Sequence, residues 1–172
     1  MSLSTTGVPS REQVESTLPS KERMQEGPVA IFECFEPIPC DPCYTACTFG
    51  AVEEFADINH TPSVSLETCN GCGMCVAACP GLAVFIVDTS KPGDMGIVRI
   101  PYELEPLPEK DEEVTAISRD GRALGPATVT RVQKGIKGGT PVVWLEVPKA
   151  MAMEVRHLEL KRGAQSERDQ HA

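Results

Sequence analysis

CNGCGMCVAACP, residues 69–80, is the part of this sequence that most constrains its structure. Two, two and three residues separate its four cysteines, and Pro80 follows the last one. This spacing places three thiolates on a tight loop around one [4Fe-4S] cluster and throws a fourth forward on the helix that follows. Gly71 and Gly73 let the backbone pass close to inorganic sulfide, where amide N–H groups can donate hydrogen bonds. The motif therefore predicts iron–sulfur binding.

A second cysteine group lies upstream, at Cys34, Cys40, Cys43 and Cys47. Its last three members keep the spacing of two and three. Five residues, FEPIP, separate the first two cysteines where two are usual, and Thr48 stands where proline is expected. We expect the inserted residues to bulge without losing the ligand. A [3Fe-4S] centre is the alternative here if Cys34 or Cys40 lies too far out.

Zinc and disulfides are the competing explanations for eight cysteines in 172 residues. Structural zinc sites use paired CxxC knuckles set well apart, and a compact run of four closed by Cys-Pro is rarely one. Disulfides are disfavoured in the cytoplasm, where we place the protein because residues 1–27 contain no apolar signal core. The sequence therefore favours iron–sulfur clusters over both alternatives.

Composition and charge argue against several functions. The formal net charge is −9 and no basic stripe occurs, so neither nucleic acid nor an anionic membrane is an expected partner. The longest apolar run, residues 81–87, is too short to cross a bilayer. No nucleotide-binding or nucleophile motif occurs, and the three histidines have no catalytic neighbours in sequence, so we expect no catalytic site. Acidic residues near the cysteines, such as Glu33, Glu36, Asp41 and Glu67, predict low reduction potentials.

The chain divides by composition into five regions, for which an α+β fold is expected. They are an extended N-terminal arm (1–27) with at most one short helix near 11–17, a cysteine-bearing domain (28–104), a linker (105–111), a small all-β, barrel-like module (112–162) and a disordered tail (163–172).

Apolar and alternating runs predict the strands of both folded regions. Predicted strands of the cysteine-bearing domain are residues 29–32, 63–66, 82–88 and 97–104, and those of the β module are 114–118, 127–132, 142–147 and 155–160, with one helical turn at 148–153. So many short strands in about fifty residues favour a closed barrel or a sandwich. Trp144 is expected in the core of that module, and Met151 and Met153 are expected to pack rather than bind metal.

Residues 28–90 resemble a bacterial two-cluster ferredoxin, on the strength of both cysteine groups. In that family each cluster takes three cysteines from one motif and the fourth from the other. The resemblance implies one [4Fe-4S] cluster on Cys34, Cys40, Cys43 and Cys79, and another on Cys69, Cys72, Cys75 and Cys47. Metal–ligand bonds would then replace part of the hydrophobic core, so we expect the iron-free chain to be unstable.

Residues 27–43, GPVAIFECFEPIPCDPC, are also similar to the small iron–sulfur subunits of FAD-dependent amino-acid dehydrogenase complexes of the hydroxyproline, proline and sarcosine type. This resemblance implies a subunit that relays single electrons between flavin centres or to an acceptor, with FAD or FMN only on the partner subunits. The alternative is a standalone dicluster ferredoxin that serves several oxidoreductases. That alternative predicts a monomer that is stable alone.

Overall fold

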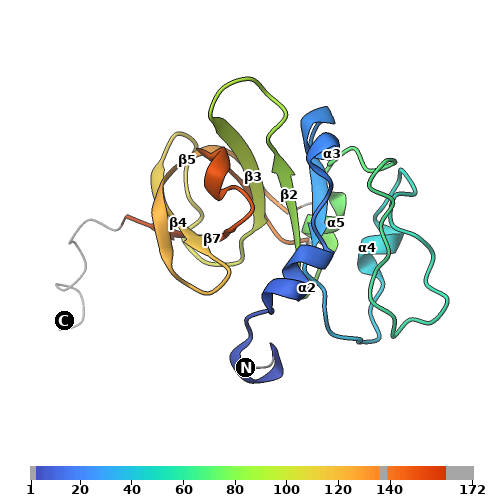
Figure 1. The fold of residues 1–172 in the computed structure, drawn as a ribbon. Coiled ribbons are helices and arrows are strands. Elements are labelled where there is room, and N and C mark those ends of the chain that lie inside the picture. Colours follow the sequence, from blue (N-terminus) through green and yellow to red (C-terminus); the bar gives the residue numbers. More distant parts are fainter. Residues whose placement is uncertain (1–2, 136–138, 162–172) are drawn as a thin grey trace, which may run out of the picture.

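The structure is a computed structural model that describes residues 3–135 and 139–161. A curved antiparallel sheet forms one side of the molecule, short helices run beside it, and the cysteine-bearing loops lie at the other side (Figure 1). No helix among the described residues has the length and apolar character that crossing a membrane requires. The tail predicted at 163–172 lies outside the described residues.

The short helix predicted near 11–17 in the N-terminal arm is confirmed, but the arm is not extended, because helices also form on either side of it. It forms three short helices, α1 (Leu3–Thr6), α2 (Arg11–Ser16) and α3 (Lys21–Glu26). The side chains of Ser10 and Ser20 each accept a hydrogen bond from the backbone N–H three residues on, and these caps begin α2 and α3. Met24 then packs against the main core, so α3 is anchored to the sheet.

Seven of the eight predicted strands are confirmed. They are β1 (Val29–Phe32), β2 (Val84–Asp88), β3 (Met95–Pro101), β4 (Glu113–Ser118), β5 (Ala123–Gln133), β6 (Val142–Pro148) and β7 (Val155–Leu160), and the helical turn η1 (Lys149–Met151) precedes β7. The strand predicted at 63–66 is wrong. Val64 makes only an isolated bridge to Val52, because the chain enters a turn at 66–68.

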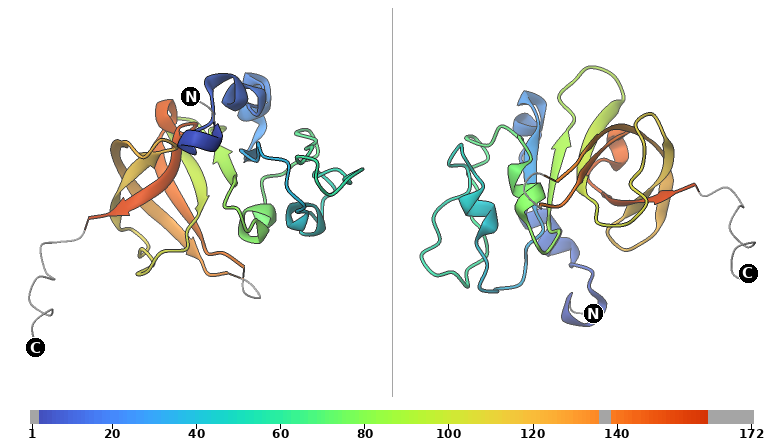
Figure 2. Two further views of the ribbon diagram at one scale, coloured as in Figure 1. Left: turned by 90° about the horizontal axis from the view of Figure 1, so that it is seen from below. Right: turned by 180° about the vertical axis from the view of Figure 1, so that it is seen from behind.

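The two folded regions share one sheet, with the strand order β1-β2-β3-β6-β5-β4-β7. β3 pairs with β6 along its whole length, from Met95 opposite Pro148 to Pro101 opposite Val142. The predicted closed barrel or separate sandwich is therefore wrong. The sheet is open, with β1 and β7 at its edges, and it curls so that β7 contacts β3 (Figure 2).

The sheet buries both of its faces near β1 and β2, which explains their continuous apolar sequences. Val29, Ile31, Phe85 and Val87 face the large core that β3 to β7 complete. The alternate residues, Ala30, Phe32, Val84 and Ile86, face a smaller cluster that also contains cysteine side chains. β1 and β2 thus form the wall on which the cysteine-bearing loops rest.

Candidate metal centres

Residues 33–82 contain all eight cysteines and little regular structure. Two short helices, α4 (Pro42–Thr45) and α5 (Met74–Ala78), each carry one cysteine, and another cysteine lies just beyond each helix. All eight are free thiols. They are distributed between two separate cavities.

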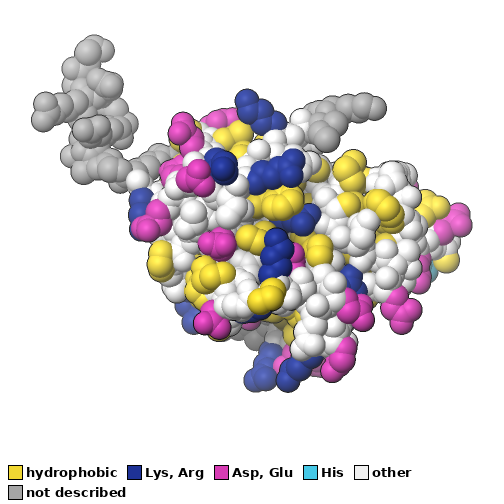
Figure 3. Space-filling model, turned by 90° about the horizontal axis from the view of Figure 1, so that it is seen from above, with side chains coloured by type: hydrophobic (Ala, Val, Ile, Leu, Met, Phe, Trp, Pro, Cys, Tyr) yellow, Lys and Arg dark blue, Asp and Glu magenta, His cyan; other side chains and the backbone are white. Residues whose placement is uncertain are grey.

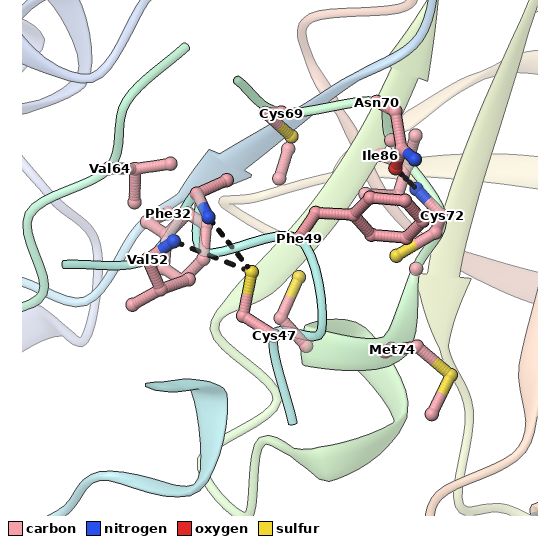
Figure 4. A pocket seen from close by; sticks show the side chains of 15 residues that line it. Phe32, Cys47, Phe49, Val52, Val64, Cys69, Asn70, Cys72, Met74 and Ile86 are labelled. Carbon is pink, nitrogen blue, oxygen red and sulfur yellow. Dashed lines mark hydrogen bonds between the residues drawn. The ribbon is translucent and has the colours of Figure 1, made fainter. Parts of the chain in front are cut away.

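The first cavity is lined by Cys47, Cys69, Cys72 and Cys75, among other residues. Three of these come from residues 69–80 and one, Cys47, from the upstream group. Figure 4 shows Cys47, Cys69 and Cys72 arranged around a shared space, with the ring of Phe49 beside it. We call this space the downstream cavity.

The second cavity is lined by Cys34, Cys40, Cys43 and Cys79, among other residues. Here the exchange is reversed, because Cys79 comes from the downstream group. The inserted FEPIP segment does not remove Cys34 from the set. We call this space the upstream cavity. In each cavity, the four lining cysteines are the four that the ferredoxin resemblance groups together.

Electrostatics favour the protonated form of one thiol in each cavity when no cation is present. Burial, followed by Cys69, Cys72 and Cys47, raises the pKa of Cys75 to about 12. In the upstream cavity, burial and then Cys79 raise the pKa of Cys43 to about 11. Four thiolates crowded together repel one another, so a group of high positive charge must replace their protons.

Backbone amides supplement the thiols. The N–H groups of Ala51 and Val52 donate to Cys47 Sγ at 3.2 and 3.4 Å (Figure 4), and Ala83 N–H donates to Cys79 Sγ at 3.4 Å. Burial alone would raise the pKa of Cys47, but these and neighbouring N–H groups lower it below its ordinary value. Amide donors to sulfur are a regular part of iron–sulfur sites.

The two donor sets fit iron–sulfur clusters, since each consists of four sulfur ligands with amide support. Among residues 3–135 and 139–161, no group of three or more His, Cys, Asp or Glu side chains is placed so that it could hold one metal ion. In a cubane each thiolate binds a different iron, so the four sulfurs need not converge on one point.

Two arginines outside residues 33–82 hold the CNGC loop (residues 69–72) and the chain just before it. Arg23 on α3 donates from Nε to the Leu66 carbonyl at 2.6 Å and from Nη2 to the Cys69 carbonyl at 2.5 Å. Arg99 on β3 donates from Nη1 to the Gly71 carbonyl at 2.6 Å. We did not identify either residue from the sequence. The sequence contained a signal only for Arg99, which is the one charged residue inside the apolar run 97–101.

A buried ion network holds the start of the upstream group. Glu33 pairs with Arg119 at 3.0 Å and with Arg156 at 2.7 Å, and all three side chains are about nine-tenths buried. Burial alone would raise the pKa of Glu33, but the two guanidinium groups hold it below its usual range. The negative charge of Glu33 is therefore compensated, so this residue does not support the low potentials expected from the sequence.

Several other predicted roles can be assessed. Trp144 does not lie in the core of a separate module. It faces the cysteine side of the sheet and packs against the smaller cluster. Met151 and Met153 pack against the large core, as predicted. His157 stacks on Tyr102, and burial lowers its pKa, whereas His171 lies outside the described residues.

Comparison with known proteins supports the iron–sulfur interpretation of one motif. Residues 62–85 match the 4Fe-4S binding domain. No curated protein and no solved structure matches the chain. The matched segment contains Cys69, Cys72, Cys75 and Cys79 but not the upstream group. This region is therefore a ferredoxin-like, iron–sulfur segment suited to electron transfer rather than catalysis.

Proposed function

We propose that this chain is the electron-transfer subunit of an amino-acid or amine dehydrogenase complex and that it holds two [4Fe-4S] clusters. The observation that carries the proposal is the presence of two cavities, each lined by four cysteines and each drawing on both sequence motifs. An exchange of this kind ties the two halves of the cysteine-bearing region together. The match of residues 62–85 to the 4Fe-4S binding domain supports the nature of the group.

The proposed ligands follow the lining of the cavities. One cluster takes Cys34, Cys40, Cys43 and Cys79, and the other takes Cys69, Cys72, Cys75 and Cys47. When bound, a cubane accepts and returns one electron at a time, which suits it to accept electrons from a two-electron flavin. The chain itself positions the sulfurs and supplies their amide donors. Apolar side chains such as Phe32 and Val84 keep water from the inner walls of the cavities.

Exposed apolar side chains beside the cavities support a partner subunit. Ile38 lines the upstream cavity and is 46% exposed, and Phe49 and Met74 line the downstream cavity and are 53% and 37% exposed. Apolar groups of this size at a surface are typical of protein interfaces when they gather in one place. We place FAD or FMN and the C–N bond oxidation on that partner, and we expect the complex in the cytoplasm without nucleic acid or membrane attachment.

Charge distribution on the surface is consistent with protein docking at the cysteine-bearing side. Residues 28–90 contain eight acidic residues, seven of them between 33 and 67, and no lysine or arginine. On the face drawn in Figure 3, basic side chains gather at the middle and left, whereas the right end shows hydrophobic and acidic ones. A partner would therefore meet an acidic, partly apolar surface close to both cavities.

Native purification with metal analysis tests the proposal. The chain is isolated anaerobically from its source, and iron, sulfide, zinc and flavin are measured together with the EPR spectrum of the reduced sample. We expect about eight iron atoms, two interacting paramagnetic centres and co-purifying flavin-bearing chains. Zinc in place of iron would contradict the cluster assignment. A brown, flavin-free monomer would contradict the subunit assignment and favour a standalone dicluster ferredoxin.

A further inference from the structure

Every lysine or arginine side chain that reaches residues 28–90 comes from outside this segment. Residues 28–90 contain no lysine or arginine. Arg23 precedes this segment, and Arg99, Arg119 and Arg156 follow it. The cations divide into two kinds. Arg119 and Arg156 have carboxylate partners in Glu33 and Glu154, whereas neither Arg23 nor Arg99 is in ion-pair contact with a carboxylate among the described residues.

The position of Arg99 is set by the register of the sheet. Arg99 on β3 lies opposite Trp144 on β6, and Trp144 lies opposite Arg131 on β5. The Arg99 guanidinium lies 3.8 Å from the centroid of the Trp144 ring and is 9% exposed as a residue. Stacking on an aromatic face and burial hold the group in one orientation. From there its Nη1 reaches the Gly71 carbonyl.

Arg23 and Arg99 both contact carbonyl oxygens of the segment 66–71. Because a peptide unit directs its C=O and N–H in opposite directions, the N–H groups of these peptide units point away from the arginines. That of Cys72, opposite the Gly71 carbonyl, donates to Asn70 Oδ1 at 3.1 Å. Gly71 itself lines the downstream cavity. The Cys72 thiolate is near enough to act electrostatically on Arg99, and Asp88 acts on it only at longer range than an ion pair.

We propose that Arg23 and Arg99 form an arginine clamp on the CNGC loop, and that its uncompensated positive charge gives the centre in the downstream cavity the higher reduction potential. This inference rests on the proposed function. A fixed cation in a poorly solvated site stabilises the added electron, whereas the arginines near Cys34 are neutralised by their carboxylate partners. Electrons entering the chain would then settle first on the downstream centre. Arg23 and Arg99 are positioning residues, since they act on the loop and not on a substrate.

The test is an EPR-monitored redox titration of the full-length holoprotein. Arg99→Gln removes the charge, Arg99→Lys keeps it without the planar stack, and Arg131→Gln is the matched control. Arg131 also lies over Trp144, with its guanidinium 5.0 Å from the centroid of the ring, but it is exposed and makes none of the clamp's hydrogen bonds. Cys72→Ser, which alters a side chain of the downstream cavity alone, assigns the two signals.

We expect Arg99→Gln to lower the midpoint potential of the downstream centre and to leave the other unchanged. Arg99→Lys keeps the positive charge, so its downstream centre should have a midpoint potential close to that of the wild type. If the role of Arg99 were purely structural, the Lys and Gln variants would behave alike. Arg131→Gln should move neither potential. If Arg99→Gln fails to retain iron, Arg23→Gln, on the short surface helix α3, replaces it in the test. It should likewise lower the midpoint potential of the downstream centre alone.

Failure of the clamp is distinguishable from failure of the proposed function. If the Arg99 and Arg23 variants retain iron and sulfide but shift both potentials equally or not at all, the clamp proposal is wrong. The proposal of two clusters would still stand. Wild-type protein without iron would instead overturn the proposed function.

Discussion

Gly71 shows how a single residue controls the cysteine loop. Its φ is +64°, a region that favours glycine, and a Cβ atom there would lie 2.6 Å from the Pro28 Cβ and 2.7 Å from the Pro28 carbonyl carbon. The loop therefore packs directly on the start of β1. The sequence motif explained this glycine by its approach to sulfide, whereas the structure adds a second constraint from Pro28.

Substitution of Gly71 by alanine separates these constraints when it is compared with Gly50→Ala. Gly50 has a φ of +66° and nothing within 4 Å of its Cβ position, so it carries only the backbone cost of about 1–2 kcal/mol. We expect Gly71→Ala to cost about 1–3 kcal/mol more through the clash and to lose iron faster. Urea denaturation followed by circular dichroism, with iron release in parallel, measures both. Equal losses in the two variants would contradict the contact with Pro28.

At the scale of elements, the Glu33 network joins the end of β1 to the far part of the sheet. Arg119 lies in the turn between β4 and β5 and also bonds Glu154, whose side chain is 50% exposed, while Arg156 lies on β7 and stacks on Phe85. Cys34 follows Glu33 directly. The upstream cysteine group is thus attached to strands that are more than eighty residues away in sequence.

Removal of the buried carboxylate should therefore destabilise the protein far more than removal of the exposed one. We expect Glu33→Gln to cost about 3–5 kcal/mol, because it leaves Arg119 and Arg156 buried without their counter-charge. Glu154→Gln, the control, should cost less than about 1 kcal/mol. Chemical denaturation compares the two free energies of unfolding. A similar small loss in both variants would show that the network contributes little.

At the scale of the whole molecule, the sheet and the cysteine-bearing loops are stabilised by different means. The large core draws on β1 to β7 and is continuous, whereas residues 33–82 place few side chains in any core. Metal–ligand bonds are the expected source of order in such a segment. The two parts should therefore respond differently to the loss of iron.

Iron removal by a chelator under reducing conditions tests this division. We expect the amides of β3 to β7 to stay protected from hydrogen exchange and those of residues 33–82 to lose protection, because only the latter depend on the clusters. The sequence alone led us to expect an unstable iron-free chain throughout. Uniform loss of protection would support that earlier expectation, and unchanged protection in 33–82 would contradict a structural role for the clusters.

Local pattern determined much of this protein without the structure. Cysteine spacing, the proline after Cys79 and the apolar runs predicted the iron–sulfur motif of residues 69–80 and seven strands, because ligand spacing and strand periodicity are properties of short segments. The grouping of the cysteines followed from a family resemblance, and the two cavities have the same membership; occupation by two clusters stays a prediction. In residues 3–26 only the helix near 11–17 was expected, and α1 and α3 were missed, since a serine cap rather than apolar periodicity begins α3.

Only the tertiary structure decided how distant segments meet. That β3 and β6 join two regions into one sheet depends on pairing between residues more than forty positions apart. The same pairing places Arg99 over Trp144 and against Gly71, and folding of the strands brings Arg156 to Glu33. A sequence pattern shows an arginine in an apolar strand but not the carbonyl or carboxylate it will reach, because that partner is chosen by long-range packing.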